Sequence, residues 1–272
     1  MPTRLIMSHQ PWGRDFHRLG AYRAEHGYHG VEWAMEGMRL PVAHARLQRM
    51  LTQMRAVAPH ASYHAPYSDI EIAHRDPAIG QASLDALKRY VDAIAPMGAH
   101  HLNCHVGSFG LGPDERSWDR MVDNVREIAA YGEARGLIVT IENLQEGLSS
   151  EPDLFCRLVT ETGIRVTFDI GHANGSDWVC SGRGTAAEFI RRLGGCIVAA
   201  HVYEIEAGDA HHAPRDLSRI GAALRELSRV GCDWWVLELP RLDLLEATRN
   251  VVDRFVAEQE GPQRLLGHGR VG

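Results

Sequence analysis

Short apolar runs recur along the chain, and each one ends at a residue that can bind a metal ion. The runs cover residues 61–63, 101–104, 137–141, 166–168, 197–200 and 234–237. The residues that end them, 27 to 41 positions apart, are His64, His105, Glu142, Asp169, His201 and Glu238. A strand, a helix and their connections need about 30 residues or more. The pattern therefore predicts a (β/α)8 barrel with ligand-type residues at the carboxyl ends of its strands.

Segments with helical spacing separate these strands, and several of them stop at a glycine. Helices are expected, in chain order, at 77–97, 118–135, 153–162, 186–193, 217–230 and 242–258. Two further strands, at 4–7 and 30–33, bring the count to eight, so residues 1–260 are predicted to form a single TIM-barrel domain. Residues 261–272 are polar and glycine-rich, which predicts a flexible C-terminal tail.

Composition and charge narrow the class of protein. The chain has 272 residues, of which 44% are apolar, and a net charge of −6 at pH 7. This charge argues against nucleic acid as a partner, because binding phosphates needs several Lys or Arg side chains. The sequence has no long apolar run, no signal peptide and only scattered cysteines, so we expect a cytoplasmic protein without a membrane partner. A small-molecule substrate is the expected partner. The sequence leaves open whether the protein is a monomer or a homo-oligomer.

Four of the ligand-type residues end successive strands, so a barrel would bring them side by side. They are Glu142, Asp169, His201 and Glu238. One such residue alone could stabilise a turn or a helix N-terminus, but four in succession favour a metal site. Carboxylates with one imidazole, and no thiolate, suit one divalent metal ion: Mn²⁺, Co²⁺, Mg²⁺ or Zn²⁺.

Five further residues are candidate ligands of metal or substrate. His64 and His105 reach the same face from the third and fourth strands, where a buried histidine bonded to a carbonyl is the alternative. His172 follows the sixth strand and could instead cap a helix. Asp209 and His211 follow the seventh strand, where polar loop residues are usually solvated.

Three residues near the first two strand ends are candidates for substrate binding. His9 follows the first strand, and Glu32 and Trp33 end the second. Core packing is the alternative for Trp33, because large aromatic side chains are usually buried.

The motifs around these positions resemble those of the xylose-isomerase-like TIM barrel superfamily. The resemblance runs in order over nearly the whole chain, through residues 62–66, 102–108, 141–143, 169–172, 201–204, 208–212 and Glu238. This superfamily includes sugar phosphate isomerases and epimerases, ketose 3-epimerases, dehydratases and endonuclease IV.

The resemblance to ketose 3-epimerases implies one metal ion on Glu142, Asp169, His201 and Glu238. It implies an isomerase or epimerase that acts on a small sugar-like or polyhydroxylated keto substrate. The reaction would be proton abstraction through a metal-stabilised enediolate, with Glu142 and Glu238 as catalytic proton acceptor and donor.

Two other activities in the superfamily are alternatives. Endonuclease IV, a phosphodiesterase, holds three zinc ions on nine ligands, and all nine positions have a suitable residue here: the four above with His64, His105, His172, Asp209 and His211. A lyase of the dehydratase kind would use the same base and metal. The chain departs from the superfamily at Glu204, where an aspartate is common, and at 213–216, where a glycine-rich segment is usual.

Overall fold

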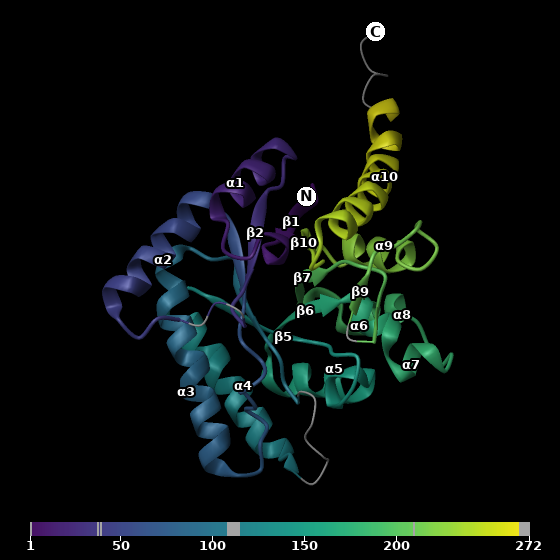
Figure 1. Ribbon diagram of the computed structural model, residues 1–272. Helices are drawn as coiled ribbons and strands as arrows, with labels where there is room; N and C mark the ends of the chain where they lie inside the picture. The colour runs from purple at the N-terminus through teal and green to yellow at the C-terminus, as the bar shows by residue number, and fades with distance from the viewer. Residues whose placement is uncertain (1, 37, 39, 108–114, 209, 267–272) are drawn as a thin grey trace.

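The computed structural model describes residues 2–36, 38, 40–107, 115–208 and 210–266. Eight parallel strands close into a barrel in the order β1-β10-β7-β6-β5-β4-β3-β2 (Figure 1). Their bounds are Arg4–Ser8 for β1, Gly30–Ala34 for β2, Ala61–His64 for β3, His101–Cys104 for β4, Ile138–Glu142 for β5, Arg165–Asp169 for β6, Ile197–His201 for β7 and Trp234–Leu237 for β10. The predicted (β/α)8 barrel is confirmed.

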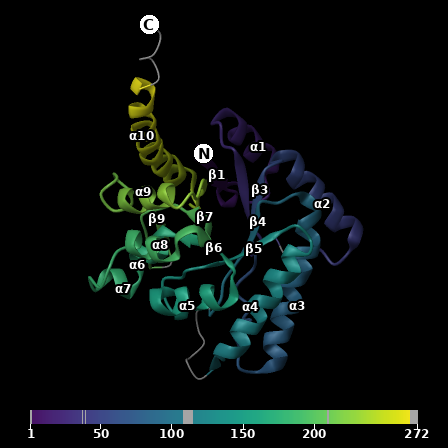
Figure 2. The ribbon, with the colours of Figure 1, turned by 180° about the vertical axis from the view of Figure 1, so that it is seen from behind.

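Helices surround the barrel on all sides, as the two opposite views show (Figures 1 and 2). The main ones are α1 (Phe16–Glu25), α2 (His44–Val57), α3 (Pro77–Ile94), α4 (Trp118–Glu133), α5 (Pro152–Thr162), α8 (Ala186–Leu193), α9 (Gly221–Arg229) and α10 (Leu242–Leu266). Short 3-10 turns are η1 (Gln10–Trp12), η2 (Ala95–Met97), η4 (Leu148–Ser150) and η5 (Gly194–Cys196).

The helix ends follow local sequence signals. Ser117 caps α4 by accepting a hydrogen bond from a backbone N–H, and Thr185 forms a capping box with Glu188 at the start of α8. Helix α2 was not predicted, because only Leu51 and Met54 of its fourteen residues are buried. Helix α10 continues eight residues beyond its predicted end, to Leu266.

The barrel interior is polar below the carboxyl ends of the strands. Every residue of β3, β4 and β10 is buried, as expected for strands enclosed by helices. Thr140 on β5 donates to Asn103 Oδ1 at 3.1 Å, and its hydroxyl lies 2.8 Å from that of Thr167 on β6. These bonds satisfy the polar side chains and tie neighbouring strands together below the candidate site.

Three short elements at the carboxyl ends of the strands were not predicted. Helices α6 (Ile170–Gly175) and α7 (Asp177–Cys180) follow β6, and an antiparallel hairpin of β8 (Ile205–Ala207) and β9 (Ala210–His212) follows β7. Helix α6 packs against β8, and Asn174 Nδ2 donates to Glu204 O at 2.7 Å. The hairpin thereby covers one side of the strand ends. Within the described residues, no helix is both long and apolar enough to cross a membrane.

Candidate metal centre

The structure brings the four ligand-type residues of the later strands into one buried cluster. His201 Nδ1 lies 3.2 Å from Glu142 Oε1, 3.3 Å from Asp169 Oδ2 and 3.0 Å from Glu238 Oε2. A tetrahedral cation with ligands at 2.0–2.1 Å holds its ligand atoms about 3.3 Å apart. These three distances match that spacing, and the ligand atoms of all four residues lie within 4.8 Å of one another, so the cluster could hold one metal ion.

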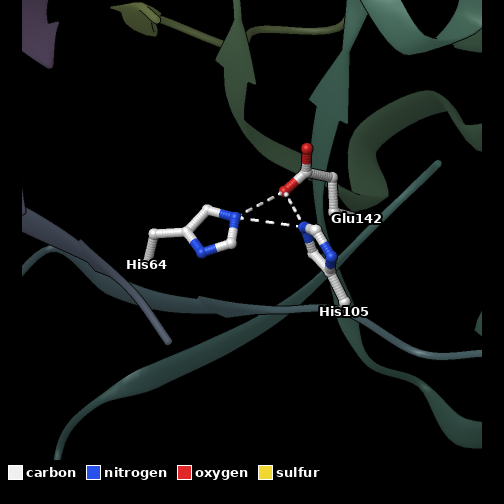
Figure 3. Close-up of side chains that lie close together, drawn as sticks. All are labelled: His64, His105 and Glu142. Carbon is white, nitrogen blue, oxygen red and sulfur yellow. Dashed lines mark hydrogen bonds and ion pairs between the residues drawn. The ribbon is translucent and has the colours of Figure 1, made fainter. Parts of the chain in front are cut away.

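A second triangle of ligand atoms adjoins this cluster and shares Glu142. His64 Nε2 lies 3.1 Å from His105 Nε2 and 3.3 Å from Glu142 Oε2, and His105 Nε2 lies 3.5 Å from the same oxygen. Figure 3 shows the three side chains pointing toward one another. Because Oε1 of Glu142 belongs to the first cluster and Oε2 to this one, the carboxylate bridges both.

A third group lies beside α6 and contains a residue that sequence reasoning missed. His172 Nε2 lies 2.9 Å from Glu206 Oε2, and ligand atoms of His172, Glu206 and His211 all lie within 4.8 Å of one another. Glu206 pairs with His211 across the β8–β9 hairpin, so only a correct hairpin prediction would have found it. The predicted ligand Asp209 lies outside the described residues.

Backbone carbonyls fix the orientation of three of these imidazoles. The Nδ1 atom of His64 donates to Ala65 O at 2.8 Å, that of His172 to Asn143 O at 3.0 Å and that of His211 to Glu238 O at 2.7 Å. A carbonyl can only accept, so Nδ1 carries the proton in each ring. The Nε2 atom is then left to face a cluster, which is the usual arrangement of a metal-binding histidine.

Two features of the later strand ends position Asp169. Asn143 accepts from Asp169 N–H at 2.9 Å and donates from Nδ2 to Asp169 O at 2.8 Å. Asp169 Oδ1 in turn accepts from His172 N–H at 2.7 Å, as the N-cap of α6. The other carboxylate oxygen, Oδ2, is buried and has no hydrogen bond among the described residues. It is free to bind a cation.

Without a cation, protons balance the carboxylates. Burial alone would lower the pKa of His64, but the hydrogen bond and charge of Glu142 raise it to about 9. Burial opposes the charged form of His201 too, yet Glu238 and Glu142 raise its pKa well above the usual value. Burial lowers the pKa of His105, which stays neutral beside His64. A divalent cation would replace these protons, and the oxygen and imidazole donors suit Mn²⁺, Co²⁺, Mg²⁺ or Zn²⁺.

The three candidate substrate-binding residues are buried, and Glu32 lies beside His201 of the first cluster. Glu32 is 2% exposed, and its Oε1 lies 2.9 Å from His201 Nε2, on the opposite edge of that ring from the clustered carboxylates. Trp33 is fully buried and packs against His9 and Phe16. His9 Nδ1 accepts from the backbone N–H of Ala34, and burial lowers its pKa to about 4. Contact of these residues with a substrate stays a prediction.

A closed parallel barrel with ligand clusters at the carboxyl ends of its strands defines the class of protein. The chain belongs to the xylose isomerase-like TIM barrel family, whose sequence pattern matches residues 21–256. A relative is the uncharacterized protein MJ0008 of Methanocaldococcus jannaschii. It is 26% identical over 187 residues, which cover 69% of this chain and 75% of the relative.

Solved structures share the fold over almost the full length. A D-tagatose 3-epimerase-like protein has a TM-score of 0.74 at 18% identity, covering 94% of this chain and 99% of that one. An L-ribulose 3-epimerase has a TM-score of 0.73 at 13% identity over the whole of both chains. A probable 3-DHS dehydratase of Bacillus anthracis, AsbF, has a TM-score of 0.65 at 13% identity, covering 93% and 99%. At these identities the similarity concerns the fold.

Proposed function

We propose that the protein is a divalent-metal-dependent isomerase or epimerase that acts on a small polyhydroxylated keto substrate. The observation that carries the proposal is the convergence of two glutamates on one ligand position: Glu142 and Glu238 both lie within 3.2 Å of His201 Nδ1. The similarity in fold to proteins named as 3-epimerases supports the substrate class. The net charge of −6 is compatible with a small substrate and unfavourable for a nucleic acid.

Glu142, Asp169, His201 and Glu238 would hold the metal ion. When bound, a divalent ion at this position supplies a positive charge that polarises a substrate carbonyl and acidifies the neighbouring C–H. Carboxylate oxygens with one imidazole suit Mn²⁺, Co²⁺, Mg²⁺ or Zn²⁺, and any of these ions could supply the charge.

In this proposal the two glutamates would act on opposite sides of a substrate. Glu142 ends β5 and Glu238 follows β10, and β6 and β7 lie between these strands in the barrel. Burial opposes ionisation of Glu238, but the charge and hydrogen bond of His201 keep its pKa well below the usual value. It therefore stays an ionised base. Epimerisation needs a base on one side of the carbon and an acid on the other.

The His64–His105–Glu142 triangle could accept the proton that is abstracted from the substrate. Glu142 Oε2 lies 3.3 Å from His64 Nε2 and 3.5 Å from His105 Nε2. A proton taken from the substrate by Glu142 can pass to His105, whose imidazole is neutral because burial lowers its pKa. When Glu238 takes the proton on one face of the carbon, His64, whose pKa is raised to about 9 and whose Nε2 lies 3.3 Å from Glu142 Oε2, would supply a proton through Glu142 to the opposite face.

A second candidate function is a multi-zinc phosphodiesterase, and one observation favours it. Glu142 joins two ligand clusters, and His172, Glu206 and His211 form a third. Neighbouring metal ions in such clusters clamp the attacking and leaving oxygens of a phosphodiester. In this function the triangle would hold a second cation in place of a proton.

Metal content separates the two functions. We would load the purified protein with Mn²⁺, Co²⁺ or Zn²⁺, remove excess metal and measure the equivalents retained by elemental analysis. One equivalent supports the isomerase, and two or three support the phosphodiesterase. Incision of duplex DNA at an abasic site by the zinc-loaded protein would overturn the first proposal in favour of the second.

Activity would then be tested on a panel of ketoses in D₂O. The proposal expects deuterium at the carbon next to the carbonyl in wild-type protein. Glu238→Gln should fold and lose about 10²–10⁴-fold in rate, as is typical when an acid–base group is removed. Glu258→Gln, an exposed glutamate on α10, is the matched control and should keep full activity. Products that have lost water would identify a dehydratase instead.

A further inference from the structure

A buried carboxylate lies directly behind the candidate metal centre without belonging to it. Glu32 extends from β2 into the barrel, and its Oε1 lies 2.9 Å from His201 Nε2. That nitrogen has no other hydrogen-bond partner among the described residues, and Glu32 Oε1 lies within hydrogen-bonding distance of it. The imidazole thus has three carboxylates at its Nδ1 edge and one, that of Glu32, at its Nε2 edge.

We propose that Glu32 is a positioning residue that acts on the metal ion through His201. The inference rests on the metal binding assumed in the proposed function and adds a residue that touches neither metal nor substrate. His201 Nδ1 faces Glu142, Asp169 and Glu238, so its other nitrogen must point away from the metal. A carboxylate at that nitrogen fixes which one carries the proton and makes Nδ1 a stronger donor.

His201 differs in this respect from His64 and His211. The rings of these two histidines present Nε2 to their clusters and bond a neutral backbone oxygen through Nδ1. The ring of His201 is reversed and has a charged partner. A carboxylate attracts an imidazole N–H more strongly than a carbonyl does. The ligand at the centre of the first cluster therefore has a charged partner on the side away from the metal position.

Side chains from two further strands hold Glu32 in place. Its Oε2 accepts from Ser62 Oγ at 2.8 Å, and Ser62 Oγ accepts from Trp234 Nε1 at 3.2 Å. Ser62 is the register partner of Glu32 on the adjacent strand β3. His101 Nε2 lies farther away, at 3.7 Å, and burial keeps that imidazole neutral by lowering its pKa. Glu32 is thus fixed by one hydrogen-bonded chain and aimed at His201.

The test compares metal binding in Glu32→Gln, Glu32→Asp and wild-type protein. Co²⁺ affinity would be measured by chelator competition, and the visible d–d absorption would report the ligand field at the ion. Glu32→Gln should bind Co²⁺ about 10–100-fold more weakly, the usual effect of removing a partner of a ligand. Its absorption band should shift. Glu32→Asp keeps the charge and should recover part of the affinity.

Two controls make the result specific. Glu226→Gln removes another buried glutamate, one that pairs with Arg191 and Arg229 on the outside of the barrel, and should leave Co²⁺ binding unchanged. Ser62→Ala removes the support of Glu32 without removing charge and should give a smaller loss of affinity. It also keeps the inference testable if Glu32→Gln does not fold.

The outcomes distinguish the inference from the proposed function. If wild-type protein binds Co²⁺ and folded Glu32→Gln binds it with the same affinity and spectrum, the positioning role is wrong and the proposed function stands. Equal binding by Ser62→Ala and wild type would count against the supporting chain in the same way. If wild-type protein binds no Co²⁺, Mn²⁺ or Zn²⁺, both the proposed function and the inference are wrong.

Discussion

Asn143 fastens the end of β6 to the end of β5, and its removal should weaken both the fold and the metal site. Its side chain makes two hydrogen bonds to the backbone of Asp169, and its own carbonyl accepts from His172 Nδ1. Asn143→Ala removes the first two bonds and keeps the third. The truncation therefore tests the tether of Asp169 separately from the orientation of His172.

The expected loss of stability follows from the two bonds. Each buried hydrogen bond contributes about 0.5–1.5 kcal/mol net, and a buried group left without a partner costs about 1–3 kcal/mol. Asn143 and Asp169 are both buried. We therefore expect Asn143→Ala to lower the free energy of unfolding by about 2–4 kcal/mol. Metal affinity should fall by about 10-fold or more, because Asp169 is no longer held in place.

The assay is urea unfolding in EDTA, so that metal binding does not contribute to stability, followed by titration of the refolded protein with Co²⁺. Asn174→Ala is the matched control, because Asn174 makes one bond to a backbone carbonyl, that of Glu204, and none to Asp169. It should lose less stability than Asn143→Ala. A free energy of unfolding for Asn143→Ala within about 0.5 kcal/mol of wild type would refute the reasoning, since two lost buried bonds must exceed that.

Three further predictions address the site. Asp169→Ala and His201→Ala should each abolish metal retention in elemental analysis, and full retention by either would contradict the ligand assignment. Metal affinity should fall as pH decreases below the raised pKa of His201, because a cation in the first cluster must displace the proton that Glu238 and Glu142 favour on that ring; calorimetry in two buffers would detect the released protons, and no release would contradict this. Gly171→Ala would place a Cβ 1.9 Å from Tyr203 Cε2, so it should cost about 1–3 kcal/mol in urea unfolding, and unchanged stability would show that the ring moves freely.

The strand ends were predictable because two signals coincide there. The strands are rich in buried apolar residues, so a charged residue such as Glu142 or Asp169 at the end of an apolar run marks where the strand opens onto the site. The sequence therefore located the first cluster and the triangle. That these residues converge depends on closure of the barrel, which the spacing of the runs also predicted.

The β8–β9 hairpin was not predicted, although it carries a signal. Its strands have three residues each, too few for an alternating pattern, but Gly208 and Asp209 between them form a dipeptide typical of a two-residue turn. Gly208 has a φ of +59°, a conformation that favours glycine. Recognising this turn in the sequence would have predicted that Glu206 pairs with His211 and that both lie near His172.

The place of Glu32 behind His201 could not have been predicted from spacing. Strands β2 and β7 are not neighbours, and the sequence pattern fixes only which residues face inward. Which nitrogen of a histidine ring an inward side chain approaches from across the barrel depends on strand tilt and on the rotamer of the histidine. The sequence therefore identified Glu32 as a polar strand-end residue and assigned it to the substrate.

The two candidate functions differ in what occupies the His64–His105–Glu142 triangle. A proton there leaves Glu142 with one cation and a route for proton transfer, which an epimerase needs. With a second cation there, both oxygens of Glu142 would serve as ligands, and Glu142 would not be available as a base. Since the pKa of His64 is raised to about 9, the proton competes with a cation across the neutral range. Metal supply and pH therefore act on the same three side chains, and the first cluster serves either chemistry.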